Sequence, residues 1–130
     1  MNEKITSENY VENVLRTESP GNSETVARLT EPQTIRLLHA AMGMVTEAAE
    51  LLDMLKKHIF YGKILDLINA KEEIGDSQWY SGLGIDIIGT TFNEVLTINI
   101  EKLRARYPEK FTEEAAINRN LKIERKVLEK

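Results

Sequence analysis

The sequence predicts an all-α protein, a helical bundle built on an antiparallel helix hairpin that completes a four-helix core by oligomerisation. Only three prolines and seven glycines interrupt the 130 residues, and runs of Ala, Leu, Glu, Lys and Ile favour long helices. No segment shows the strict apolar and polar alternation of a half-buried strand. Residues 85–88 come closest, and we interpret them as the end of a helix.

The N-terminal half predicts two helices separated by a break. The first is expected over residues 7–18, and residues 19–23 (SPGNS) form a turn-rich break after it. Thr30 can cap the second helix, and Pro32 is tolerated in its first turn. This helix is expected to run to about Tyr61, where a following glycine ends it.

The C-terminal half predicts three more helices. Asp66 can cap one that runs towards Gly89, and Thr91, three residues before a glutamate, opens another that ends before Pro108. A last helix with a charged, exposed surface is expected over residues 113–129. The two longest helices are joined by a short turn and should pack as the antiparallel hairpin. Burying both faces of this hairpin in one short chain is difficult, so we expect a homo-oligomer, with a tetramer favoured over a dimer.

Composition restricts the class of protein. The length suits one domain over residues 1–130, with residues 1–6 and 126–130 peripheral. A net charge of −4 argues against a nucleic-acid partner. There is no cysteine, which excludes disulfides and thiolate metal sites. No apolar run has the length of a membrane span and no signal peptide is evident, so we expect a cytoplasmic protein without a membrane partner.

Two acidic pairs carry the expected chemistry. Glu47 and Glu50 are three residues apart on the second predicted helix, and Glu73 and Asp76 are three apart on the third. This spacing puts both members of a pair on one helix face, and antiparallel helices can bring the two pairs together. Four facing carboxylates would repel one another strongly. Mg²⁺ or Mn²⁺, which prefer oxygen ligands, would remove that repulsion.

Three blocks of the chain resemble a known family. Residues 38–50 (LHAAMGMVTEAAE), 73–80 (EIGDSQWY) and 99–108 (NIEKLRARYP) look like the signature blocks of MazG-like nucleoside triphosphate pyrophosphohydrolases, in the same order and spacing. The resemblance covers roughly residues 7–120. It implies an all-α, metal-dependent enzyme that cuts ribo- or deoxyribonucleoside triphosphates into monophosphate and pyrophosphate.

The resemblance also implies roles for particular residues. The carboxylates expected to bind Mg²⁺ or Mn²⁺, as two or more ions, and to carry catalysis are Glu47, Glu50, Glu73 and Asp76. Glu47 is our choice for the group that orients or deprotonates the attacking water. The residues expected to contact the substrate are His39, Lys57, Tyr80, Asn99, Lys102 and Arg106. The chain departs from the family where relatives commonly carry glycine, with Thr46 and Ala49 in those places.

Some residues near the acidic motifs also have simpler structural explanations. Lys56 and Lys57 are spaced to pair with Asp53 on the helix surface. At least one of Trp79 and Tyr80 is expected to serve core packing.

The sequence also bears on two other functional classes. The main alternative is a non-catalytic helical interaction protein with a degenerate metal site. A di-iron bundle is rejected because it requires Glu-x-x-His motifs, which this sequence lacks.

Overall fold

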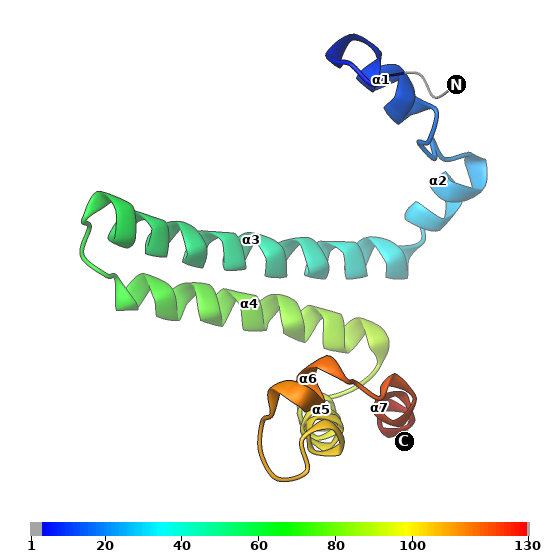
Figure 1. Ribbon diagram of the computed structural model, residues 1–130. Coiled ribbons are helices and arrows are strands. Elements are labelled where there is room, and N and C mark those ends of the chain that lie inside the picture. The colour runs from blue at the N-terminus through cyan, green and yellow to red at the C-terminus, as the bar shows by residue number, and fades with distance from the viewer. Residues whose placement is uncertain (1–3, 130) are drawn as a thin grey trace. The chain divides into compact units, whose positions relative to one another are not determined.

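The computed structural model describes residues 4–129, and its regular structure over that range is entirely helical (Figure 1). In chain order the helices are α1 (Ser7–Leu15), α2 (Ser23–Leu29), α3 (Pro32–Tyr61), α4 (Leu67–Ile88), α5 (Phe92–Arg106), α6 (Glu113–Ile117) and α7 (Leu121–Leu128). The predicted all-α class is confirmed. None of the described helices combines the length and apolar character that crossing a membrane requires. Residues 1–3 and 130, at the two ends expected to be peripheral, lie outside the described range.

The chain divides into two units, one up to Ile35 and one from Arg36 onward. In the first unit, α1 ends at Leu15, earlier than predicted, and α2 was not predicted at all. Asn22 and Thr25 start α2 by capping each other. The Thr25 backbone N–H donates to Asn22 Oδ1 at 3.0 Å, and the Asn22 N–H donates to Thr25 Oγ1 at 3.2 Å. Part of the predicted break therefore serves as the cap of a short helix.

Helices α3 and α4 follow the predicted bounds, and side-chain and glycine caps define both ends of α4. The Asp66 carboxylate accepts hydrogen bonds from the backbone N–H groups of Ile68 and Asn69 at 3.1 and 3.0 Å, which starts α4. Gly89 ends it with φ +70°, a left-handed conformation that glycine adopts without steric cost.

Contacts in the second unit show that α3 and α4 run in opposite directions, side by side (Figure 1). Arg36, near the start of α3, forms an ion pair with Asp86, near the end of α4, at 2.6 Å. Glu47, midway along α3, lies close to Glu73, towards the start of α4. The antiparallel course puts the two acidic motifs at the same level.

One contact between α3 and α4 requires glycine. A Cβ atom added to Gly43 would lie 2.2 Å from the ring of Tyr80, far inside van der Waals contact. The ring therefore rests directly on the α3 backbone. Gly75 differs, because an added Cβ there would meet no atom within 4 Å. Close packing of the helices explains Gly43 on α3 but not Gly75, the residue before Asp76 on α4.

Gly43→Ala is expected to destabilise the protein. Alanine favours helix by about 1 kcal/mol over glycine, but the clash with Tyr80 must displace the ring, and overpacking costs about 1–3 kcal/mol. The net result should be a lower midpoint in urea unfolding followed by circular dichroism. Gly75→Ala is the matched control and should be neutral or stabilising, because its site is open. Equal midpoints for Gly43→Ala and wild type would contradict the close contact.

The C-terminal region is not the single helix predicted over residues 113–129. It breaks between α6 and α7, because Asn120 accepts a hydrogen bond from the Ile123 N–H at 3.2 Å and caps α7. Helix α7 packs on α5 around Glu124, which is 5% exposed although the region was expected to be exposed. Arg106 Nε donates to Glu124 Oε1 at 2.9 Å, and Arg119 adds a second ion pair at 2.8 Å.

The apolar core of the described residues is small. Ala40, Met54 and Ile87 are its buried apolar side chains. Many larger apolar side chains lie exposed, including a series along α3. A single copy of the chain therefore leaves much apolar surface in contact with water.

Candidate metal centre

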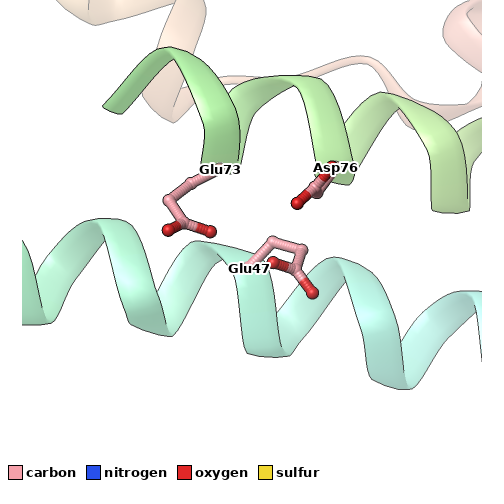
Figure 2. Close-up of side chains that lie close together, drawn as sticks. All are labelled: Glu47, Glu73 and Asp76. Carbon is pink, nitrogen blue, oxygen red and sulfur yellow. The ribbon is translucent and has the colours of Figure 1, made fainter. Parts of the chain in front are cut away.

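Three carboxylates meet between α3 and α4. Each of Glu47, Glu73 and Asp76 offers one carboxylate oxygen, and these atoms all lie within 4.8 Å of one another. Figure 2 shows Glu47 on α3 facing Glu73 and Asp76 on α4. Glu73 is buried, Glu47 is half-buried and Asp76 is exposed, so the group is open to solvent on one side. We call these three residues the carboxylate cluster.

Asn69 positions the buried member of the cluster. Its Nδ2 donates a hydrogen bond to Glu73 Oε1 at 2.6 Å. One oxygen of Glu73 is therefore held by the protein, and the carboxylate has a fixed orientation. Asn69 was not predicted from the sequence. Its position one turn before Glu73 on the same helix face is the signal that could have identified it.

Burial and neighbouring carboxylates shift the pKa of Glu47. Partial burial raises the pKa of its carboxyl above the ordinary value, and the neighbouring acids Glu73, Glu50 and Asp76 raise it further. The Thr46 hydroxyl, 3.3 Å from Glu47 Oε1, opposes this rise. Thr46, one of the departures from the family pattern, therefore contacts a cluster carboxylate. A cation between the carboxylates would favour their charged forms.

Glu50, the fourth predicted ligand, lies outside the cluster. It is exposed on α3, and it raises the pKa of Glu47 through its charge. The donors of the cluster are all carboxylate oxygens, one of them on a buried, oriented side chain. This donor set fits a hard divalent cation such as Mg²⁺ or Mn²⁺, which would complete its coordination with water.

A polar hollow of about 640 Å³ adjoins the cluster at the end where α3 passes into α4. Its wall carries the ammonium groups of Lys57 and Lys63 beside four carboxylates, those of Glu50, Asp53, Asp66 and Glu73. Lys57 was a predicted substrate contact, whereas Lys63, in the turn before α4, was not identified from the sequence. The predicted pairing of Lys56 and Lys57 with Asp53 is confirmed, and Lys57 Nζ lies 2.7 Å from that carboxylate.

An aromatic hollow of about 350 Å³ lies on the other side of the cluster. Its wall consists of Glu47, Asp76, Trp79 and Tyr80. The Trp79 and Tyr80 rings meet edge to face with centroids 5.0 Å apart, and Trp79 is 62% exposed. Tyr80 is half-buried over α3, so it is the packed member of the two.

His39 extends this aromatic group. Its ring meets Tyr80 edge to face at 5.7 Å, and its side chain is exposed. The structure therefore brings two predicted substrate contacts, His39 and Tyr80, into contact with each other, and Tyr80 alone of the two lines the aromatic hollow.

The three predicted contacts on α5 lie apart from both hollows. Lys102 Nζ donates to Asn99 Oδ1 at 2.9 Å, and Arg106 is held by Glu124. None of Asn99, Lys102 and Arg106 contributes to the wall of the polar or the aromatic hollow. Within one copy of the chain, the block on α5 is thus not joined to the carboxylate cluster.

Compared with known family models, curated proteins and solved structures, the chain has no match, so the geometry of the site itself carries the functional argument.

Proposed function

We propose that this protein is a divalent-metal-dependent hydrolase that cuts nucleoside triphosphates between the α and β phosphates, releasing nucleoside monophosphate and pyrophosphate. One observation carries the proposal. The carboxylate cluster borders a polar hollow with two lysines through Glu73 and an aromatic hollow through Glu47 and Asp76. A nucleoside triphosphate has the same three parts in the same order: an anionic phosphate tail, a metal-binding phosphate and an aromatic base.

The chain's carboxylates have distinct roles in this proposal. Glu47, Glu73 and Asp76 would hold Mg²⁺ or Mn²⁺, and Glu50, on the wall of the polar hollow, would help to hold a second ion. Such ions would supply charge stabilisation at the phosphate oxygens and would make water more acidic. Glu47, which faces the other two cluster carboxylates from α3, accepts the proton of the attacking water. Asn69 keeps Glu73 oriented throughout.

In this proposal the two hollows bind different parts of the substrate. Lys63 attracts the departing pyrophosphate, because an ammonium group neutralises phosphate charge without a fixed geometry. Lys57 joins it by exchanging its exposed ion pair with Asp53 for the phosphate. The base stacks against Trp79 or Tyr80 and reaches His39 at the edge of the same group. Arg106 is occupied by Glu124, so we assign it to holding α5 and α7 together rather than to phosphate binding.

We further propose that the protein works as a homo-oligomer. The antiparallel hairpin of α3 and α4 would pair with that of another copy to form a four-helix core, and a tetramer is favoured. The many exposed apolar side chains of α3 support this proposal. Asn99 and Lys102 would then approach a substrate held by a different copy.

The test is product analysis with purified protein. Each common ribo- and deoxyribonucleoside triphosphate is incubated with Mg²⁺ or Mn²⁺, and the phosphate products are separated. Monophosphate and pyrophosphate are expected, and Glu47→Gln should abolish them. Glu72→Gln, an exposed neighbour of the cluster on α4, is the matched control and should retain turnover.

Failure to hydrolyse any nucleotide, with both metals and at several pH values, would overturn the proposal for these substrates. An accompanying failure to bind Mn²⁺ in a titration would favour the non-catalytic interaction protein instead.

A further inference from the structure

The turn that joins α3 to α4 is held by the side chain of His58, near the end of α3. Residues 62–66 connect the two helices, and Lys63 lies near the start of this connection. His58 Nδ1 lies 2.7 Å from the carbonyl oxygen of Lys63. A carbonyl oxygen can only accept a hydrogen bond, so Nδ1 carries a proton and is the donor. His58 thus fixes one of the two polar groups of the Lys63 backbone.

The other polar group of the Lys63 backbone is also held by the end of α3. Its N–H donates to the carbonyl oxygen of Lys57 at 3.2 Å. Gly62, between the helix and Lys63, has φ +66°, the left-handed conformation with which helices commonly end. Since N–H and C=O are both held, the φ and ψ angles of Lys63 keep one arrangement. The direction in which the Lys63 side chain leaves the backbone is therefore set.

Lys63 gives the polar hollow a positive charge that no carboxylate neutralises directly. Lys57 Nζ lies 2.7 Å from the Asp53 carboxylate, and Lys56 binds the same carboxylate. Lys63 also lies in the wall of the hollow, and within residues 4–129 it takes part in no ion pair. A phosphate group can therefore meet Lys63 without breaking an existing pair, whereas it must replace Asp53 at Lys57.

We propose that His58 is a positioning residue for phosphate binding. By holding the Lys63 carbonyl, its ring keeps the Lys63 ammonium group at the polar hollow, where this group meets the phosphate tail of the substrate or the pyrophosphate product. A lysine whose backbone is already ordered loses less freedom on binding, and binding is stronger for that reason. The inference rests on the proposed function, in which this hollow receives the phosphates, and it adds a residue that touches neither substrate nor metal.

The hydrogen bond from His58 does not satisfy a buried group. His58 and Lys63 are both exposed, so water can serve the Lys63 carbonyl when the ring is absent. The packing of α3 on α4 depends on other contacts, such as that between Gly43 and Tyr80. Loss of the His58 hydrogen bond should therefore act mainly on the order of the turn that carries Lys63.

The test measures binding of inorganic pyrophosphate in the presence of Mg²⁺ by titration calorimetry. His58→Phe keeps an aromatic ring but removes the donor, and it should weaken binding about two- to tenfold, the cost of ordering one flexible side chain. His58→Asn keeps an N–H donor near the place of Nδ1 and should recover most of the affinity. Lys71→Met removes an exposed lysine of α4 outside the wall of the hollow, and it should bind pyrophosphate like the wild type.

A double-mutant cycle shows whether His58 acts through Lys63. Lys63→Met alone should weaken pyrophosphate binding about tenfold, because a hydrogen bond between charged groups is lost. His58→Phe added to Lys63→Met should weaken it no further, because the group that His58 positions is already absent.

Several results would overturn the positioning role. They are a full additional loss in the double variant, equal affinities of His58→Phe and His58→Asn, wild-type affinity of His58→Phe, and a wild type that does not bind pyrophosphate. A protein that shows the expected binding pattern but hydrolyses no nucleotide would overturn the proposed hydrolase activity and would support the role of His58 at an anion site.

Discussion

Glu73→Gln is expected to abolish Mn²⁺ binding and, in the absence of metal, to make the protein more stable. The cluster holds carboxylate oxygens within 4.8 Å of one another, and Glu73 is its buried member. Glutamine keeps an oxygen that can accept the hydrogen bond from Asn69, but it removes one negative charge and one ionic ligand. The wild type should therefore gain stability from Mn²⁺, about 2.7 kcal/mol at a hundred times the dissociation constant, while the variant gains almost none.

The measurements are thermal unfolding with and without Mn²⁺, titration calorimetry and turnover. Loss of an oriented ligand should lower kcat/KM at least about 100-fold, because even indirect partners of a metal cost 10–100-fold. Glu72→Gln, the next residue along α4, is exposed and should respond to Mn²⁺ as the wild type does. If Glu73→Gln bound Mn²⁺ with unchanged affinity, the cluster would not be the metal site.

Glu124→Gln is expected to destabilise the protein strongly near neutral pH and to remove part of its sensitivity to acid. The hydrogen-bonded ion pair with Arg106, and then that with Arg119, lowers the pKa of Glu124 from 4.5 to about 2. A lowered carboxyl pKa contributes stability that is present above the unfolded value and disappears as the pH falls from about 4.5 towards 2. The substitution also leaves Arg106 without its charged partner in a largely buried position.

Circular dichroism melting at pH 7 and at about pH 3 tests this prediction. At pH 7 the unfolding midpoint should fall by about 5 °C or more, and the difference from the wild type should shrink at the lower pH. Glu129→Gln removes an exposed pair with Arg125 on the same helix, and it should change the midpoint little. A Glu124→Gln protein that melts like the wild type at pH 7 would contradict the structural role of this ion pair.

Local signals in the sequence were sufficient to predict α1 and the long helices, but not α2 or the break between α6 and α7. Asp66 and Gly89 mark the ends of α4 by capping that depends only on nearby residues. The cap of α2 is equally local, but this helix has only seven residues and follows several turn-forming residues, so its sequence resembles a loop. Asn120 broke the expected final helix because its side chain competes for a backbone N–H group.

The site was predictable to the extent that it follows helical spacing. Spacing placed Glu47, Glu73 and Asp76 correctly, because the antiparallel course of two helices needed only their connecting turn. Helical spacing did not show that Glu50 lies outside the cluster. Glu50 follows Glu47 by three residues, about one turn, and spacing alone does not show which of the two lies opposite Glu73 and Asp76. Glu124 was beyond such reasoning, because its partner Arg106 lies eighteen residues away on another helix.

The contact between Gly43 and Tyr80 also limits how this protein can change in evolution. The Tyr80 ring rests on Gly43, which has no side chain. A larger residue in place of Gly43 alone would clash with the ring, and a smaller residue in place of Tyr80 alone would leave a void. A larger residue on α3 therefore requires a smaller one on α4, and the exchange would reshape the wall of the aromatic hollow. Homologues of this chain should show the two positions varying together.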